Sequence, residues 1–226
     1  MNIVVSGASK GIGFELAEQA ALSGHNVLAI ARNKQLLETL RAKSNLISIL
    51  RVDLINDQCE SAVAKWVEEN GKVDALINNA GQLINKPFLE TTAAEFKGQF
   101  DANVVTAVKL IQTAVPFCNE NAHMVNISSM GGFQGSSKYP GLSAYSASKG
   151  ALSVLTECLS VELKEQHISV NALALGAVQT EMLESAFPGY EAPVMPREMA
   201  TYILEFATTG HKYYNGQILS VALGNP

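Results

Sequence analysis

Residues 2–13 read Asn-Ile-Val-Val-Ser-Gly-Ala-Ser-Lys-Gly-Ile-Gly, a short run that leads through a glycine turn into a helix. The run at residues 2–6 is rich in valine and isoleucine, which favour strands. Residues 11–22 then carry apolar side chains at helical spacing. A strand, a tight turn and a helix in this order predict the first unit of a parallel α/β sheet.

The same alternation continues along the chain. Further strands are expected at residues 26–31, 46–52, 73–77, 123–127, 168–173 and 217–221. Further helices are expected at residues 34–42, 57–70, 143–166 and 196–207, with two helical segments within residues 92–118. Strands that are apolar throughout and alternate with helices indicate a parallel sheet covered on both faces. We therefore predict one Rossmann-like α/β domain over residues 1–226, with a doubly wound parallel sheet of about seven strands.

The composition argues against several classes of protein. Hydrophobic residues make up 47% and charged residues 16% of the 226 residues, which argues against disorder. The formal net charge of -5, without a long basic run, disfavours nucleic acid as a partner. No apolar stretch reaches the ~18 residues that a membrane span needs, so we expect no transmembrane helix.

Cysteine and histidine usage suits a reducing compartment and no metal. Cys59, Cys118 and Cys158 are scattered and odd in number, which fits the cytoplasm better than a disulfide scaffold. The four histidines lack the spacing of metal ligands, so we expect neither a structural nor a catalytic metal. The chain begins directly with the apolar residues 3–5 instead of a basic leader, so we expect no signal peptide.

Chemically useful residues follow the strands. In open parallel sheets, ligands bind beyond the carboxyl ends of the strands. Polar residues or glycines stand after six successive expected strands, namely Gly7, Arg32, Asp53, Asn78, Ser129 and Gly176. The sequence therefore predicts one ligand site along this edge of the sheet.

The glycine turn at residues 7–13 predicts a pyrophosphate site. Its spacing is Gly-x-x-x-Gly-x-Gly, and the glycines permit close approach of a ligand to the backbone. The N-terminus of the following helix offers free N–H groups and the positive end of a dipole. The alternative is an ordinary glycine-rich turn between a strand and a helix.

Charge at the second strand predicts the cofactor. A site for NAD places an acid there, to bind the ribose hydroxyls. Here Arg32 stands at that point, and the first acid afterwards is Glu38, inside a helix. Arg32 and Lys10 are suited to grip a 2′-phosphate, with the Ser9 hydroxyl adding a hydrogen bond, so we expect NADP(H) in preference to NAD(H). The alternative for Arg32 is a solvated loop charge.

Asp53 allows two interpretations. It follows the third expected strand, where its carboxylate can accept a hydrogen bond from an adenine amino group. It can equally be the N-cap of the following helix.

Tyr145-Ser146-Ala147-Ser148-Lys149 predicts an acid–base pair. On a helix, residues four apart share a face, so Lys149 lies close to the Tyr145 phenol. A nearby ammonium and a cationic nicotinamide ring favour the phenolate, which would bring its pKa down from about 10 toward neutrality. Such pairs are common, and the alternative is an incidental pair on a solvated helix face. The order of the other motifs decides between them.

Together these motifs resemble the short-chain dehydrogenase/reductase family, in its compact single-domain branch. The resemblance runs from Asn2 to about Leu223 and rests on an ordered set of segments. The segments are the glycine turn, residues 78–81, Asn103, residues 126–129, residues 145–149, and Gly176 with Thr180.

The resemblance implies a role for each catalytic residue. Tyr145 gives a proton to a ketone, or takes one from an alcohol. Lys149 lowers the pKa of Tyr145 and holds the nicotinamide ribose. Ser129 hydrogen-bonds the substrate oxygen, although Ser128 could play that part. Asn103 holds a water that links Lys149 to solvent, although alone it would be read as a buried, backbone-bonded amide.

The resemblance also implies the cofactor contacts. Residues 79–81 lie beside the adenosine half, and Val178 and Thr180 contact the carboxamide. With the residues argued above, the expected cofactor set is Gly7, Ser9, Lys10, Gly11, Ile12, Gly13, Arg32, Asp53, Leu54, Asn79, Ala80, Gly81, Tyr145, Lys149, Val178 and Thr180.

Other segments concern the substrate and the oligomer. Residues 181–195 are expected to form a short substrate lid. The apolar residues of the 143–166 helix are expected to face the core; they are Ala151, Val154, Leu155, Cys158, Leu159 and Leu163. Because the family pairs this helix and the one before it across subunits, we expect a homodimer or homotetramer.

The resulting hypothesis is an NADP-dependent oxidoreductase that transfers hydride between NADPH and a carbonyl or secondary alcohol. A 3-oxoacyl-carrier-protein reductase is an alternative within that class, for which Lys138 and Arg197 are the only nearby basic candidates. A non-catalytic NADP-binding sensor or scaffold is the alternative from another class.

Overall fold

Seven parallel strands form one sheet in the order β3-β2-β1-β4-β5-β6-β7. The computed structural model describes residues 1–223, and these counts refer to that part of the chain. The strands are β1 (Asn2–Ser6), β2 (Asn26–Ala31), β3 (Ile47–Arg51), β4 (Val73–Asn78), β5 (Cys118–Ser129), β6 (Ser169–Leu175) and β7 (Ile218–Val221). The predicted α/β class and doubly wound parallel sheet are confirmed.

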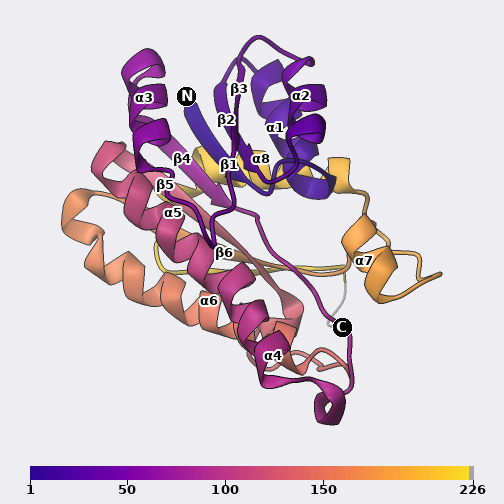
Figure 1. Cartoon of the computed structure of the whole chain (residues 1–226). Helices are drawn as coiled ribbons and strands as arrows, with labels where there is room; N and C mark the ends of the chain where they lie inside the picture. The colour runs from indigo at the N-terminus through magenta and orange to yellow at the C-terminus, as the bar shows by residue number, and fades with distance from the viewer. Residues whose placement is uncertain (224–226) are drawn as a thin grey trace.

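Helices cover both faces of the sheet (Figure 1). The helices are α1 (Gly11–Leu22), α2 (Lys34–Arg41), α3 (Glu60–Asn70), α4 (Ala93–Phe100), α5 (Thr106–Ala114), α6 (Ser143–Glu162), α7 (Glu181–Ala186) and α8 (Pro196–Thr209). Helices α1, α2 and α8 pack on one face, and α3, α5 and α6 on the other (Figure 1). This arrangement explains the continuous apolar strands, because both faces of each central strand are buried.

Successive residues of β1 divide between the two cores. Ile3 and Val5 pack with α1 and α8, whereas Val4 packs with the α3 and α5 side. All three side chains are fully buried. From β1 the chain winds outward to β2 and β3, and then returns to β4 on the other side of β1. The connections therefore diverge between β1 and β4, which opens a crevice at the carboxyl ends of these strands.

Several element boundaries differ from the expected ones because of side-chain contacts. α3 begins at Glu60 instead of residue 57, because Asp57 accepts a hydrogen bond from the Asp53 amide and holds a turn there. The two expected helical segments at 92–118 join through a π-helical turn, Asp101–Val105. The expected helix at 143–166 ends at Glu162, and its last residues form a separate 3₁₀ turn.

One prediction about α6 was wrong. Val154 is 58% exposed and Cys158 is also exposed, although both were assigned to the core. The buried face instead carries mainly small hydroxyl residues and Lys149. Ser148, Ser153 and Thr156 can be buried because each hydroxyl has hydrogen-bond partners on the helix and on a neighbouring element.

Within residues 1–223, no helix combines the length and the apolar character that a membrane crossing requires.

Candidate active site

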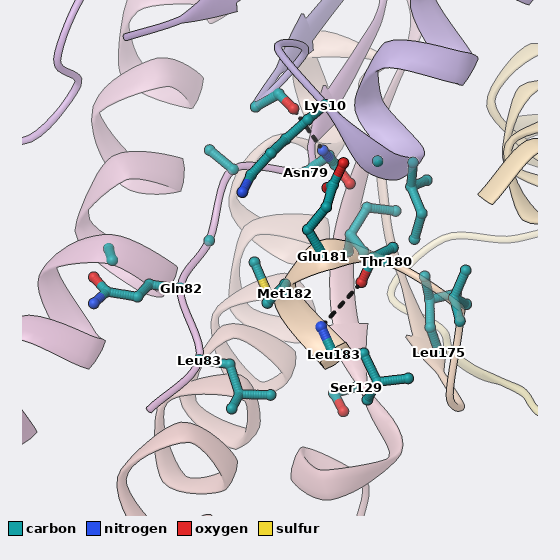
Figure 2. Close-up of a pocket in the computed structure, with 18 of the residues that line it drawn as sticks. Lys10, Asn79, Gln82, Leu83, Ser129, Leu175, Thr180, Glu181, Met182 and Leu183 are labelled. Atoms are coloured by element: carbon teal, nitrogen blue, oxygen red, sulfur yellow. Dashed lines mark hydrogen bonds between the residues drawn. The ribbon is translucent and has the colours of Figure 1, made fainter. Parts of the chain in front are cut away.

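A cavity of about 770 Å³ opens at the carboxyl ends of the strands, where the chain reverses between β1 and β4 (Figure 2). Of the residues predicted for cofactor binding and catalysis, only Gly13 and Asn103 do not line it. The predicted residues that line it are Gly7, Ser9, Lys10, Gly11, Ile12, Arg32, Asp53, Leu54, Asn79, Ala80, Gly81, Ser129, Tyr145, Lys149, Val178 and Thr180. Segments far apart in the sequence therefore meet at one site.

The glycine turn packs tightly against the end of β4. Gly7 has a φ of +69°, and a Cβ there would lie 2.8 Å from the Ala80 Cα. A Cβ on Gly13 would lie 2.4 Å from the Gly7 carbonyl oxygen, so Gly13 supports the turn from beneath. Both positions require glycine, one for its backbone conformation and both for close approach.

A serine and an asparagine hold this turn in place. The Ser6 hydroxyl accepts hydrogen bonds from the amides of Asn79 and Ala80, each at 3.1 Å. The Asn79 side-chain amide donates back to the carbonyl oxygens of Ser6 and Gly7. The first turn of α1 has no side-chain cap, so its amides remain available to an anion.

Two cationic side chains stand on the cavity wall, Arg32 after β2 and Lys10 in the glycine turn after β1. Arg32 and Lys10 are both exposed on the cavity wall, and no ion pair within residues 1–223 engages either. Figure 2 shows Lys10 extending along the cavity. Glu38, the first acid after β2, is held by Arg41 at 2.5 Å on α2. This end of the cavity therefore favours an anionic group.

Asp53 organises its own loop. One carboxylate oxygen accepts a hydrogen bond from the Ile55 amide at 3.1 Å, and the other from the Asn56 side chain at 3.0 Å. The N-cap of α3 is Cys59, so the alternative that Asp53 caps this helix is wrong. Asp53 and the buried Leu54 both line the cavity.

Tyr145 and Lys149 project from the first turns of α6 at the other end of the cavity. The Lys149 ammonium lies 5.9 Å from the centroid of the Tyr145 ring and donates a hydrogen bond of 2.7 Å to the Ile127 carbonyl oxygen. Burial lowers the pKa of Lys149 to about 8. Because the ammonium is tied to Ile127, it is held beside the phenol as the helix spacing predicted.

The pKa of the Tyr145 phenol reflects its burial. Burial raises the pKa of this phenol above its ordinary value, and a hydrogen bond with the Ser129 hydroxyl partly opposes the rise. The expected lowering of this pKa involves both Lys149 and a bound nicotinamide ring, and it stays a prediction. The pKa rises because removing the phenolate from water costs more free energy than the surrounding groups restore by stabilising its charge.

Two neighbouring serines are distinguished by their partners. Ser128 is buried, and its hydroxyl donates to the Lys149 carbonyl oxygen at 3.0 Å. Ser128 and Ser129 both line the cavity, but Ser129, labelled in Figure 2, is only partly buried, and its hydroxyl accepts a hydrogen bond from the Gly131 amide. A Cβ on Gly132 would lie 2.5 Å from the backbone of Lys149, so this turn presses directly on α6. The geometry favours Ser129, and not Ser128, as a group that meets a ligand.

The Asn103 side chain links the backbone of Gln82 to the Ser148 hydroxyl through hydrogen bonds. Its side-chain oxygen accepts a hydrogen bond from the Gln82 amide at 2.8 Å, and its amide donates to the Gln82 carbonyl oxygen and to the Ser148 hydroxyl. The residue is buried in the π-helical turn and does not line the cavity. Its side chain thus matches the alternative of a buried, bonded amide.

The segment after β6 covers part of the cavity. Thr180 caps α7 by accepting a hydrogen bond from the Leu183 amide at 3.2 Å (Figure 2). α7 itself was not predicted, although Thr180 followed by Glu181 and Glu184 is a helix-start signal. Val178 forms an isolated bridge with Val194, which closes the segment into a loop.

Some lining residues carried no sequence signal. Gln82, Leu83, Tyr139 and Leu142 come from loops without a recognisable motif. Gln82 and Leu83 follow the predicted 78–81 segment, and their proximity to that motif was the only available clue. Contacts across the mouth bring these loops together, because the Asn85 side chain donates to the Ala186 carbonyl oxygen at 2.8 Å.

No cluster of three or more His, Cys, Asp or Glu side chains suited to a metal ion occurs in the described part of the chain, residues 1–223.

Comparison with known proteins gives consistent similarities. A family model described as short chain dehydrogenase matches residues 1–191. A fatty acyl-CoA reductase of Acinetobacter baylyi is 31% identical over 216 residues, which is 90% of this chain and 71% of that protein. Carbonyl reductase 2 (NADPH) of Sus scrofa is 33% identical over 190 residues, or 80% of this chain and 73% of that protein. The structure of a 3-ketoacyl-(acyl-carrier-protein) reductase from Brucella melitensis, complexed with NADH, has a TM-score of 0.87 at 25% identity, covering 99% of this chain and 97% of that one.

Proposed function

Since this chain belongs to the short-chain dehydrogenase/reductase family, whose members act on CH–OH or carbonyl groups with a nicotinamide cofactor, we propose that it is an NADP-dependent carbonyl reductase or alcohol dehydrogenase. The observation that carries this proposal is the meeting of Ser129, Tyr145 and Lys149 at one end of a cavity whose other end is a glycine turn flanked by cations.

The residues present fit a dinucleotide. The tight approach at Gly7 and the uncapped amides of α1 suit a pyrophosphate. Asn79, Ala80 and Gly81 would border the adenosine half, and Val178 and Thr180 the carboxamide. Each oxygen of Asp53 accepts one hydrogen bond and has capacity for another, so an adenine amino group can still be bound there.

Preference for NADPH follows from charge. Arg32 stands after β2, where an NAD site would place an acid, and Lys10 of the glycine turn lines the same cavity; two cations suit a 2′-phosphate. The similar proteins named above include an NADPH enzyme and a structure complexed with NADH, so sequence similarity alone does not decide between the two cofactors. The two cations and the absence of an acid at the end of β2 support NADPH for this chain.

The acid–base chemistry belongs to Tyr145. When bound, the nicotinamide supplies the hydride for the carbonyl carbon. Tyr145 donates its proton to the carbonyl oxygen, and the Ser129 hydroxyl donates a hydrogen bond to that same oxygen as negative charge develops. The Lys149 ammonium stabilises the resulting phenolate, which offsets the cost of burial.

Asn103 would hold a water that links Lys149 to solvent. A Cβ on Gly81 would lie 2.8 Å from the Asn103 side-chain oxygen and 3.5 Å from the Lys149 Nζ. Gly81 therefore stands between the two groups and leaves room there. The π-helical turn supports the idea, because such turns are frequent at functional sites.

The substrate is a small, partly apolar carbonyl compound or alcohol. The cavity wall near Ser129 and Tyr145 carries apolar side chains from three segments, namely Leu83, Leu142, Met182, Leu183, Phe187 and Tyr190. The last four belong to residues 181–195, which act as the proposed lid. A homodimer or homotetramer in the cytoplasm completes the proposal, and three free cysteines fit a reducing compartment.

A 3-oxoacyl-carrier-protein reductase is the second candidate, favoured by the similar Brucella structure. An acidic carrier protein would need free basic side chains near the cavity. Lys138 donates to the Phe133 carbonyl oxygen within its own loop, and Arg197 pairs with Glu15 at 3.4 Å. Because both side chains have partners, this candidate ranks below a small-molecule reductase.

The test is a Tyr145→Phe variant. Loss of the proton donor is expected to lower kcat by about 10²- to 10⁴-fold toward whichever ketone, aldehyde or β-ketoacyl thioester the wild type reduces. NADPH affinity should stay within about twofold, because the phenol mainly serves the reacting oxygen. Absorbance at 340 nm reports turnover, and calorimetry reports binding.

Tyr139→Phe is the matched control, because Tyr139 also lines the cavity but is 47% exposed on a loop. It should keep wild-type kcat. Survival of turnover in Tyr145→Phe contradicts the mechanism. Tight NADPH binding by the wild type with no turnover across the panel would favour a sensor or scaffold.

A further inference from the structure

The buried face of α6 bears hydroxyl groups that join the helix to other elements. Ser148, Ser153 and Thr156 are all buried, and each hydroxyl bonds both to a carbonyl of α6 and to a residue outside it. We name these three residues, with their partners Asn103, Ser128, Asn126 and Asn78, the polar seam. Apolar side chains of α6 such as Val154 lie on its exposed side instead.

The first bond of the polar seam reaches the turn that carries Tyr145. Ser148 donates to the Tyr145 carbonyl oxygen at 2.7 Å. Asn103 donates to the Ser148 hydroxyl at 2.9 Å. The backbone of Tyr145 is therefore connected through two hydrogen bonds to the π-helical turn.

The second bond reaches the backbone of Lys149. The hydroxyls of Ser128 and Ser153 lie 3.0 Å apart. Both hydroxyls lie within hydrogen-bond distance of the Lys149 carbonyl oxygen, at 3.0 and 3.1 Å. Since each hydroxyl has one proton, Ser128 donates to this carbonyl, and Ser153 shares its proton between the carbonyl and the Ser128 oxygen. Because Ser128 belongs to β5, this carbonyl is fixed directly to the sheet.

The third bond is a relay across two strands. Asn78 on β4 donates to Asn126 on β5 at 2.8 Å, and Asn126 donates to the Thr156 hydroxyl at 2.8 Å. The Thr156 hydroxyl in turn donates a hydrogen bond to the Leu152 carbonyl oxygen at 2.9 Å. Asn126 and Thr156 are fully buried, and Asn78 is 3% exposed.

We propose that the polar seam fixes the rotation of α6 about its axis and so positions Tyr145 and Lys149 for catalysis. Apolar contacts are non-directional and tolerate small rotations, whereas hydrogen bonds weaken steeply with distance and angle. Ser153, Thr156 and Asn126 are thus positioning residues that act through the catalytic pair without touching the cavity. The inference rests on the roles proposed above for Tyr145 and Lys149.

The sharpest test uses two substitutions at one site. Thr156→Val keeps the shape but removes the hydroxyl that Asn126 and Leu152 bond, whereas Thr156→Ser keeps the hydroxyl. Thr156→Val is expected to lower kcat by about tenfold or more and to move the Tyr145-dependent limb of the pH profile of kcat/KM. Thr156→Ser should restore both to within about twofold of wild type. Measurements are made well below the unfolding temperature of each variant.

Ser160→Ala is the matched control, because the Ser160 hydroxyl bonds only to Glu157 of its own helix. It should leave kcat and the pH profile unchanged. If Thr156→Val lowers only the unfolding temperature, while kcat and the pH profile match wild type, the inference is overturned. If Thr156→Val fails to fold, Ser153→Ala takes its place with the same expected changes.

A titration of Tyr145 separates this inference from the proposed function. In protein labelled with ¹³C at the tyrosine ring, the Tyr145 signal is assigned by its absence from Tyr145→Phe. Its apparent pKa should shift in Thr156→Val and return in Thr156→Ser. If no carbonyl compound is reduced but this shift occurs, the proposed function fails and the positioning role stands. An unshifted titration overturns the positioning role whatever the turnover.

Discussion

Arg32 shows how one residue can decide cofactor choice. It is exposed at the end of β2, on the wall of the cavity, where a carboxylate would select NAD. A guanidinium there attracts a 2′-phosphate and offers it two parallel hydrogen bonds. The residue therefore ought to matter for NADPH and hardly at all for NADH.

Replacing Arg32 by Ala is expected to raise the Kd for NADPH about tenfold or more, with the Kd for NADH within about twofold of wild type. The difference should shrink at high ionic strength, because exposed charges are screened. Calorimetric titration of both cofactors measures it. Arg51→Ala is the control, since Arg51 is exposed at the end of β3 but does not line the cavity. Equal weakening for both cofactors would refute the assigned role.

His123, which does not line the cavity, makes the stability of the folded protein depend on pH. It is fully buried, with its Nδ1 3.1 Å from the Ala207 carbonyl oxygen and its Nε2 2.9 Å from the Asn171 amide. Burial lowers the pKa of His123 from 6.5 to about 4, and the ring of His211 stands nearby. The imidazole is therefore neutral in the folded protein at pH values where an exposed histidine is charged.

Stability should fall as pH drops below 6.5. Between 6.5 and about 4 the unfolded chain binds a proton that folded His123 does not, so this residue's contribution is complete above 6.5 and is lost toward 4. The loss is on the order of 3 kcal/mol. Urea unfolding across this range should show a smaller pH dependence in His123→Gln than in wild type. His167→Asn, an exposed control, should keep the wild-type dependence, and equal slopes in all three proteins would exclude His123 as the cause.

At the scale of elements, α6 has two unlike faces. Hydroxyls and Lys149 face the sheet, while Val154 and Val161 are 58% and 74% exposed beside the exposed Cys158. An apolar stripe along a long helix is typical of a surface that another subunit covers. This arrangement explains why the hydrophobic pattern predicted the wrong buried face for α6. The pattern does not show that hydroxyl groups on the other face are paired in hydrogen bonds and can therefore be buried.

A charge on this stripe should separate the subunits. The wild type is expected to run as a dimer or tetramer in size-exclusion chromatography with light scattering, and Val154→Glu as a smaller species. Burying an unpaired carboxylate at an interface costs more free energy than the surrounding apolar contacts contribute to association. Leu22→Glu changes a 64% exposed leucine on α1 and should leave the mass unchanged. A monomeric wild type would count against the proposed oligomer.

At the scale of the whole molecule, the parallel sheet brings the site together. Strands that all run in one direction deliver their carboxyl ends to a single edge, and the reversal between β1 and β4 opens that edge (Figure 1). Residues as distant as Lys10 and Thr180 consequently line one cavity. Of the six residues placed after strands in the sequence, all but Asn78 line the cavity, so the strand ends alone located the site.

The sequence by itself determined the order of strands and helices, the glycine turn and the pairing of Tyr145 with Lys149. These features depend on local periodicity, turn chemistry and helix spacing, all of which are written in neighbouring residues. Boundaries such as the start of α3 were missed, because a pair of aspartates holds a turn that no periodicity reveals.

Tertiary packing alone settles which hydrogen-bond partners Ser128 and Ser129 have, which side of α6 is buried and how burial acts on the pKa of Tyr145. It also showed that the Asn103 side chain bonds the Gln82 backbone and the Ser148 hydroxyl, contacts that the sequence did not indicate. Each of these depends on contacts between segments far apart in the chain, such as Asn78, Asn126 and Thr156. Desolvation and hydrogen-bond partners exist only once those segments have packed together.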